Sequence, residues 1–368
     1  MNYQEEFRNK KLAQGLIQRI VGLTRDLEPV KLMEVCGSHT MAICRYGIVQ
    51  LLPENVQLLS GPGCPVCVTP GDYLDKAVAL AKLPDVIVTT FGDMFKVPGS
   101  TSSLEKEKAD GAAVEVVFSP VDSVTIARDN SDKRVVFLGI GFETTIPAVS
   151  VAIKEARDQG LGNYFVLCGH KTMPPALKAL AEGGTRVNSF ICPGHVSTII
   201  GTRPYEFLAR DYGIGCVITG FEPLDVLQGI YMLLVQIAHG RPAVENQYTR
   251  LVKAEGNKAG QALIREVFDA ADVAWRGLGV IPGSGLRIRE EFAAFDAERN
   301  IDFTPEPTVE KEGCICGELL QGIKTPQECP LFGIHCTPVG PVGPCMVSSE
   351  GCCAAAYKYM ERPLGKKD

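Results

Sequence analysis

The chain has 368 residues, of which 45% are hydrophobic and 22% charged, and its formal net charge is −6. This length is enough for two or three domains, each with its own core. Because the net charge is modest and like charges form no block, the composition argues against nucleic acid as the main partner.

Apolar runs and cysteine usage bear on where the protein works. The longest apolar runs, such as residues 230–238 with Gln236 inside, are far too short to span a bilayer. Residues 1–19 mix acids and bases and lack the apolar core of a signal peptide. We therefore expect a soluble, cytoplasmic protein with no membrane partner. In a reducing cytosol, its 14 cysteines indicate metal or redox chemistry more than structural disulfides.

The first predicted element is an amphipathic helix, since apolar residues recur at helical spacing within residues 4–27. Short apolar runs that alternate with helical patterns follow. The expected strands are residues 30–35, 56–59, 85–90, 114–118, 134–138, 164–168, 189–192 and 216–219. The expected helices between them are residues 72–81, 145–157, 174–182 and 205–212. Strands that are buried on both faces and separated by helices predict an α/β fold with parallel sheets.

A strand-then-glycine pattern recurs along the chain at an offset of about 131 residues. Residues 35–41 resemble 167–173, residues 60–63 resemble 191–194, and residues 85–93 resemble 215–222. The pattern predicts an internal duplication, with two similar, Rossmann-like lobes facing each other across a cleft. The alternative is that the strand-then-glycine pattern, which is common in α/β proteins, recurs here by chance.

Three domains follow from this interpretation. The first lobe spans residues 30–130 and contains Cys36, Cys64 and Cys67, and the second lobe spans residues 131–242. From Ala243 the pattern becomes helical, through residues 259–274 to Trp275, and a polar, Pro-rich stretch precedes a cysteine-rich tail. We expect residues 1–29 and 243–368 to form the third domain.

Cys36 follows an apolar strand and precedes a glycine, so we expect it at the carboxyl end of that strand, where ligand crevices of α/β sheets lie. His39 would start the next helix and polarise the thiol, because a nearby imidazolium lowers a thiol pKa. The alternative for Cys36 is a small buried hydrophobe. Cys64 and Cys67 lie in a turn-forming loop with the spacing of disulfide exchange or of half a metal site. Thiol redox or iron ligation is favoured there over a structural loop.

Other motifs are weaker. Gly139 and Gly141 begin a dinucleotide fingerprint, but Thr144 replaces its third glycine, so NAD is not supported. No phosphate-binding P-loop or zinc-protease motif is present. His170 and His195 fit structural or cleft-lining positions better than metal ligation.

The tail holds seven of the cysteines within forty residues, at irregular spacings: Cys314, Cys316, Cys329, Cys336, Cys345, Cys352 and Cys353. Such spacing favours the four thiolates of a 4Fe–4S cluster. Zinc is the main rival, but zinc sites usually show tight Cys-x2-Cys pairs, which the tail lacks. Structural or free thiols are a third interpretation. Four ligands leave thiols over, and two of these would form a redox-active disulfide beside the cluster.

Seven motifs follow one another along the chain: Val-Cys-Gly-Ser-His-Thr, Gly-Pro-Gly-Cys-Pro-Val-Cys, Phe-Gly-Asp-Met, Gly-Phe-Glu-Thr-Thr, Pro-Gly-His-Val-Ser, Trp-Arg-Gly-Leu-Gly and Cys-Met-Val-Ser-Ser-Glu-Gly. Together they resemble the HypD family of nickel–iron hydrogenase maturation proteins. The resemblance implies two α/β lobes plus an iron–sulfur domain. It also implies a scaffold on which iron is assembled with two cyanides and one carbon monoxide. The implied partners are a HypC-type chaperone and a HypE-type cyanide donor, whose C-terminal cysteine carries a thiocarboxamide-derived group.

The resemblance also implies residue roles. Cys36 would bind iron together with the chaperone's N-terminal cysteine, His39 would support it, and Cys64 and Cys67 would be the nearby thiol pair. The cluster ligands would be Cys314, Cys329, Cys336 and Cys353. Cys316 and Cys345 would form the redox pair, and Glu350 would relay protons or order its loop. The choices between Cys314 and Cys316, and between Cys352 and Cys353, stay open.

Two other functions remain as hypotheses. A cluster-dependent thiol–disulfide reductase would turn over a thioredoxin-like substrate and hold no low-spin iron. A non-catalytic zinc scaffold would be colourless and hold stoichiometric zinc.

Overall fold

The computed structural model describes residues 6–183, 187–309 and 311–360. Helix α2 (Lys10–Thr24) begins where the Asn9 side chain accepts hydrogen bonds from the backbone N–H groups of Lys11 and Leu12, at 3.0 and 3.2 Å. A helix within residues 4–27 is therefore confirmed, although the expected start at residue 4 lies outside the described residues.

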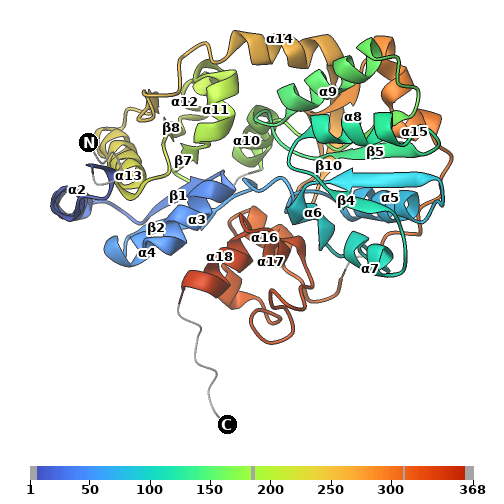
Figure 1. The fold of residues 1–368 in the computed structure, drawn as a ribbon. Coiled ribbons are helices and arrows are strands. Elements are labelled where there is room, and N and C mark those ends of the chain that lie inside the picture. The colour runs from blue at the N-terminus through green and yellow to red at the C-terminus, as the bar shows by residue number, and fades with distance from the viewer. Residues whose placement is uncertain (1–5, 184–186, 310, 361–368) are drawn as a thin grey trace.

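Two parallel sheets form most of the molecule (Figure 1). The first has the strand order β2-β1-β7-β8-β9, with every neighbouring pair parallel. Its strands are β1 (Val30–Glu34), β2 (Val56–Ser60), β7 (Ser189–Cys192), β8 (Gly215–Ile218) and β9 (Val244–Asn246). On one face, Leu32 packs with Ile20 of α2 and with Ile230 of α13 (Pro223–His239).

The second sheet has the strand order β4-β3-β5-β6 and is also parallel. Its strands are β3 (Val86–Thr90), β4 (Val114–Val116), β5 (Arg134–Gly139) and β6 (Tyr164–Cys168). Side chains alternate between its faces: Val135 packs toward α8 (Pro120–Asp129) and α9 (Ile146–Asp158), and Val136 toward α5 (Gly71–Ala81). The α/β class with parallel sheets is confirmed.

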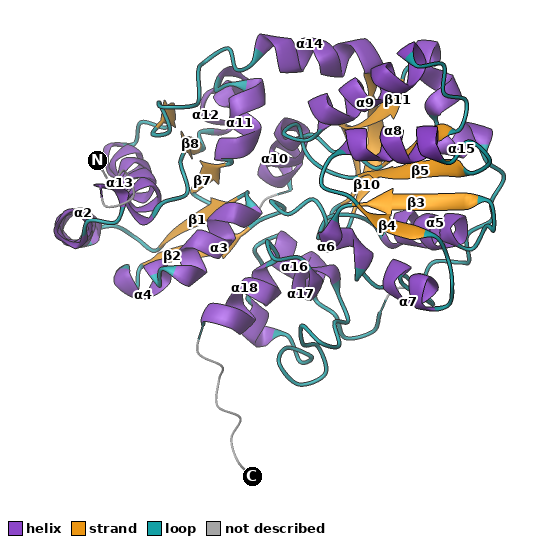
Figure 2. Cartoon of the chain, in the orientation of Figure 1, coloured by secondary structure: helices purple, strands orange, loops and turns teal. Residues whose placement is uncertain are grey.

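Helices and short turns connect these strands and cover the sheets (Figure 2). The remaining ones before the tail are α3 (Gly37–Arg45), α4 (Ile48–Leu51), α6 (Gly92–Phe95), α7 (Leu104–Ala109), α10 (Met173–Glu182), α11 (Gly194–Ile200), η1 (Arg203–Tyr205), α12 (Glu206–Tyr212), α14 (Lys258–Val267), η2 (Glu290–Phe295) and α15 (Ala297–Asn300).

The sheets group the chain differently from the expected domains. Residues 30–130 supply strands to both sheets, and so do residues 131–242, because the chain crosses from one sheet to the other after β2 and returns after β6. Helix α2 packs on α13 rather than on the cysteine-rich tail, since its apolar stripe covers the first sheet's helix layer. The boundary at residue 130 therefore does not separate the two sheets.

The internal duplication is not confirmed by this topology. The matched segments around Cys36 and Cys168 follow strands of different sheets, β1 in the first and β6 in the second. By contrast, the matched segments that follow β2 and β7 belong to the same sheet. Corresponding motifs thus do not occupy corresponding places in two lobes.

Part of the region expected to be helical from residue 243 is a hairpin. Helix α14 ends at Val267, and β10 (Phe268–Trp275) pairs antiparallel with β11 (Gly279–Ile288). The buried Trp275 indole donates to Ser284 Oγ at 2.8 Å. Pairing and burial across the hairpin override the helical preference of the alanines.

The tail has little regular structure. Its described residues form only short helices, which are α16 (Cys316–Leu320), η3 (Pro326–Glu328), α17 (Pro344–Val347) and α18 (Cys352–Tyr359). Helix α18 packs on α3, and Figure 1 shows the tail, in red, beneath the two sheets.

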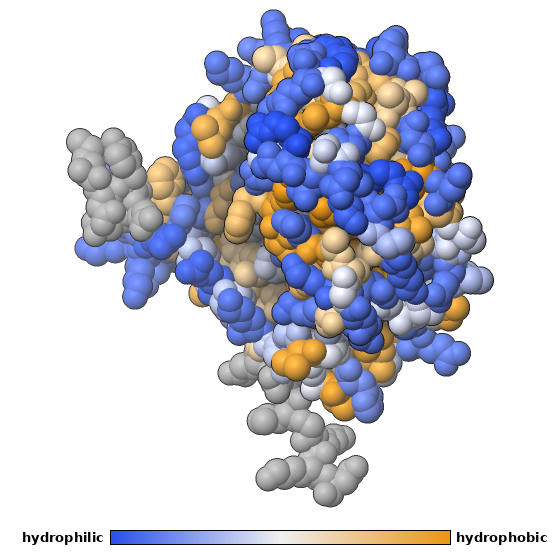
Figure 3. Space-filling model, turned by 45° about the vertical axis from the view of Figure 1, so that its right-hand side comes forward, coloured by the Kyte–Doolittle hydropathy of each residue, from blue (hydrophilic) through white to orange (hydrophobic). Residues whose placement is uncertain are grey.

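Polar residues cover most of the face seen in Figure 3, and apolar residues gather toward its middle. Within the described ranges, none of the helices combines the length and apolar character that a bilayer crossing demands.

Candidate functional site

Cys36 lies at the carboxyl end of β1 and caps helix α3, as predicted. Its carbonyl accepts hydrogen bonds from the amides of His39 and Thr40 at 2.9 and 3.1 Å. The residue is 7% exposed, and burial raises the pKa of its thiol to about 12. The Glu350 carboxylate raises that pKa further, whereas the Ser38 and His39 amides lower it. The thiol is therefore protonated at neutral pH in this structure.

The predicted thiol pair lies directly beside Cys36. Cys64 and Cys67 are both buried and are joined as a disulfide. The amide of Gly37 donates to the Gly63 carbonyl at 3.1 Å, and a Cβ at Gly63 would collide with the backbone of Cys36. Because only a glycine permits this approach, the loop holds the disulfide close to the Cys36 backbone.

Glu350 reaches the same place from the tail. Ser38 Oγ donates to Glu350 Oε1 at 2.6 Å, and a Cβ at Gly37 would collide with Glu350. On the other side, Ser348 donates to Asp93 Oδ2 at 2.8 Å, and the Glu350 amide donates to Ser348 Oγ at 3.2 Å. A continuous chain of hydrogen bonds thus runs from Asp93, beside the second sheet, to Ser38, beside the first.

These groups line a cleft of about 500 Å³. Its walls come from the loops after β1, β2, β3, β4, β5 and β7, and from the tail segment that contains Ser348 and Glu350. The carboxyl ends of strands from both sheets therefore meet at Cys36, which is where ligands of parallel α/β sheets bind.

His39 does not polarise Cys36 in the way the sequence suggested. Its Nε2 lies 2.8 Å from Thr219 Oγ1 and 3.1 Å from the Gly220 carbonyl, and its ring packs on Phe221. Burial lowers its pKa to about 4, so the ring is neutral rather than an imidazolium. Among the contacts of the described residues, none joins this ring to the Cys36 thiol. His39 instead ties α3 to the loop after β8.

Glu34 is a site residue that the sequence analysis missed. Its carboxylate accepts from the Cys36 amide at 3.0 Å and from Thr40 Oγ1 at 2.5 Å, and it is only 2% exposed. Burial raises its pKa to about 8. The signal in the sequence was an acidic residue at the end of an otherwise apolar strand, two positions before Cys36. Glu34 fixes the turn that presents the thiol.

His195 and His170 lie in cleft-lining and structural positions, as expected. His195 lines the cleft and stacks on Phe221, with ring centroids 4.1 Å apart. His170 is fully buried, and its Nδ1 lies 3.5 Å from Cys168 Sγ.

The tail cysteines converge around one small cavity. It is lined by Cys314, Cys329, Cys336 and Cys353, together with Cys316 and the apolar side chains of Leu319, Leu331, Phe332 and Met346. The four ligands that the resemblance implied thus face one apolar space from four separate segments.

Neighbouring thiols in the tail shift one another's pKa values. Cys314 and Cys345 lower the pKa of Cys316. Cys345 and Cys353 lower the pKa of Cys352 to about 5. Cys316 and Cys345, the expected redox pair, therefore lie near each other.

No ready-made single-ion site is present in the described part of the chain. There, no three or more histidine, cysteine, aspartate or glutamate side chains form a group that could hold a metal ion. The iron–sulfur cluster and the zinc alternative therefore both stay predictions.

Comparisons with known proteins identify the family. A family model named HypD, described as the hydrogenase formation hypA family, matches residues 11–360. The hydrogenase expression/formation protein HupD of Azotobacter chroococcum is 48% identical over 367 residues, covering 98% of this chain and 97% of the relative. The hydrogenase maturation factors HypD of Cupriavidus necator and Azotobacter vinelandii are 47% and 48% identical, with the same coverage. The chain therefore belongs to the HypD family of hydrogenase maturation factors.

Proposed function

We propose that this protein is the scaffold on which the iron group of nickel–iron hydrogenase, with its two cyanides and one carbon monoxide, is assembled. The observation that carries the proposal is the cleft at Cys36. One thiol stands there where two parallel sheets meet, beside a disulfide, a carboxylate and a cysteine-rich tail.

Cys36 is the residue that we assign to iron, which is the cargo rather than a resident cofactor. Soft thiolate ligands suit iron that carries cyanide. Because the free thiol is protonated, iron binding must displace a proton. Glu350, held by Ser38, is the carboxylate that we assign as the acceptor of this proton.

The partners follow from the family resemblance and from the rim of the cleft. A HypC-type chaperone would share the iron through its N-terminal cysteine, and a HypE-type protein would bring cyanide. Phe118, at the rim, is 97% exposed, and Val116 beside it is 42% exposed. Exposed apolar side chains at a cleft rim suit a partner protein.

The tail would hold a 4Fe–4S cluster through Cys314, Cys329, Cys336 and Cys353. This proposal is supported by the four thiols themselves, which are the usual ligands of such a cluster and face one apolar cavity. When bound, such a cluster supplies electrons one at a time. Cys316 and Cys345, which shift each other's pKa, would form a disulfide beside it and so store two electrons.

The test is infrared spectroscopy of the protein purified without oxygen together with its chaperone. Cys36→Ala should remove the cyanide and carbonyl bands while leaving the cluster in place. Cys44→Ala is the matched control, because Cys44 lies on the same helix but lines a different cavity, and this variant should keep the bands. Bands that persist in Cys36→Ala would show that the thiol does not hold the iron.

A second measurement separates the rival functions. The proposal predicts brown protein that contains acid-labile sulfide. Colourless protein with stoichiometric zinc would support the zinc scaffold instead. Turnover of a thioredoxin-like substrate without low-spin iron would support the reductase.

A further inference from the structure

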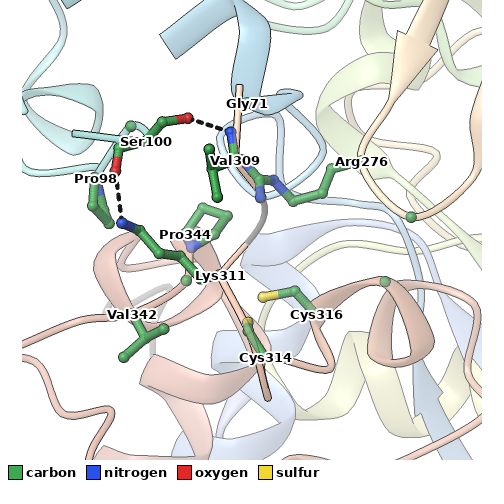
Figure 4. Close-up of a pocket in the computed structure, with 14 residues that line it drawn as sticks. Gly71, Pro98, Ser100, Arg276, Val309, Lys311, Cys314, Cys316, Val342 and Pro344 are labelled. Carbon is green, nitrogen blue, oxygen red and sulfur yellow. Dashed lines mark hydrogen bonds between the residues drawn. The ribbon is translucent and has the colours of Figure 1, made fainter. Parts of the chain in front are cut away.

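A second cavity, of about 330 Å³, lies between the second sheet's loops and the tail (Figure 4). Its walls include the 98–100 loop, the turn at Arg276, and Val309 and Lys311. Val309 is 64% exposed, so this side of the cavity meets solvent. The volume is at the lower end of the range for small-molecule sites.

The sulfur atoms of two cysteines lie at this cavity. Cys314 and Cys316 both line it, and Figure 4 shows their sulfur atoms among the side chains around it. A Cβ at Gly343 would lie 2.7 Å from Cys314 Sγ and 3.1 Å from Cys316 Sγ, so the glycine leaves these atoms uncovered. Gly277 and Gly317 also line the cavity and touch backbone to backbone, which leaves no side chain between them.

The loops around the cavity are fixed by hydrogen bonds. Ser100 Oγ accepts from the Val309 amide, and the Ser100 carbonyl accepts from Lys311 Nζ, both at 2.8 Å. Arg276 Nε donates to the Thr69 carbonyl at 3.0 Å. The opening is thus part of the folded structure and not a gap between loose segments.

The two thiols of the redox pair differ in access. Cys316 lines the cavity, whereas Cys345 is fully buried and does not line it. Of this pair, Cys316 is therefore the thiol that a molecule inside the cavity meets.

We propose that this cavity is a binding site for a small thiol or disulfide molecule, which exchanges electrons with the Cys316–Cys345 pair by reacting at Cys316. The inference rests on the redox role given to this pair under the proposed function. It names the class of molecule that reduces or oxidises the pair. A small molecule is favoured over a protein as the direct reactant, because Cys316 is only 5% exposed.

The exchange is balanced in two steps. A small disulfide is attacked by the Cys316 thiolate, which forms a mixed disulfide and releases one small thiol. Cys345 then attacks the Cys316 sulfur, which closes the Cys316–Cys345 disulfide and releases the second thiol. The pair loses two electrons and the small disulfide gains them, and a small dithiol runs the same steps in reverse.

The experiment uses the full chain, purified without oxygen, and 4,4′-dithiodipyridine as a small chromogenic disulfide. Mass spectrometry of peptides should place the first fast modification at Cys316, with two thiopyridones released as the disulfide closes. Cys345→Ser should stop after the first step and accumulate the mixed disulfide at Cys316. Fast modification elsewhere, with Cys316 untouched, would overturn the proposal.

Blocking variants test the route itself. Val309→Trp should slow modification of Cys316 roughly tenfold or more by filling the opening. Lys311→Trp should act in the same way from a neighbouring position. Val339→Trp is the matched control, since Val339 is 97% exposed in the same tail and does not line the cavity, and its rate should stay within about twofold of the wild-type rate. Equal rates in the blocked and control variants would overturn the proposal, provided that circular dichroism shows each to be folded.

A protein disulfide is the second arm of the experiment. Oxidised thioredoxin should react with Cys316 far more slowly than the small reagent does, and equal rates would assign the site to a protein partner instead. No chaperone is needed for these assays. A failure here therefore removes the small-molecule route and leaves the infrared result at Cys36 as it stands.

Discussion

Replacing Glu143 by glutamine should make the protein more stable at neutral pH. Glu143 lies in the loop after β5, and its Oε1 accepts from the Met173 amide at 2.9 Å, at the start of α10. It is only 4% exposed, and among the described residues its Oε2 has no hydrogen-bond partner. Burial raises its pKa from 4.5 to about 7.

The direction of the pH dependence of stability follows from proton binding. Between pH 4.5 and about 7 the folded protein keeps a proton on Glu143 that the unfolded chain has lost, so the free energy of unfolding falls as pH rises. The difference between the two pKa values corresponds to about 3 kcal/mol of unfolding free energy, at roughly 1.4 kcal/mol per pH unit. The contribution is complete below pH 4.5 and is lost by about pH 7. Glutamine cannot ionise and still offers an acceptor to Met173.

The assay is equilibrium urea unfolding of the wild type and Glu143→Gln without oxygen, from pH 5 to 8. Burial lowers the pKa values of His39 and His170 to about 4 and 3, so these groups make both proteins more stable as pH rises toward 6.5. Their effect cancels in the difference between the two proteins. That difference should grow in favour of glutamine up to about pH 7 and then level off. A difference that is independent of pH would refute the reasoning.

Three other changes probe the site. Gly63→Ala should change the rate of Cys36 alkylation, because the new Cβ collides with the Cys36 backbone. Gly162→Ala, at a position with open space, is the control and should leave that rate unchanged. Asp93→Ala should speed hydrogen exchange in the segment around Glu350, because Ser348 loses its acceptor. Asp93→Asn keeps an acceptor and should retain most of the protection. Equal exchange rates in the two variants would contradict this. Phe118→Asp should weaken binding of the proposed HypC-type chaperone by about tenfold or more in calorimetry, with little change in unfolding temperature, since the side chain is 97% exposed. Unchanged affinity would remove Phe118 from the proposed interface.

The sequence predicted the parts of the fold that local pattern controls. Strands such as β3 and β5 are continuous apolar runs because they are buried on both faces, so their positions could be found without knowing their partners. Cys36 was placed correctly for the same reason, since a glycine directly after an apolar run marks the end of a strand. Five cysteines line the tail cavity, and they include the four that the family resemblance implies as cluster ligands, whereas spacing alone left the ligand set open.

What the sequence could not give depends on distant contacts. Strand pairing joins β1 to β7 across more than a hundred residues, so the sharing of each sheet between the two expected lobes left no local trace. His39 was assigned to Cys36 because the two are three residues apart, but its ring bonds to Thr219, 180 residues away. The alanines of β10 favour a helix, and only the pairing with β11 makes them a strand.

The segment between Cys345 and Cys352 links the chemistry of the tail to the cleft. Ser348 and Glu350 lie within it, and they bond to Asp93 on one wall and Ser38 on the other. Gly351 packs so tightly on the backbone of Cys345 that a Cβ there would collide with it, so this segment cannot shift independently of the thiols at its ends. A disulfide between Cys316 and Cys345 would pull on one of those ends. Under the proposed function, oxidation of the tail would therefore act on Glu350, and through Glu350 on the charge that raises the pKa of Cys36.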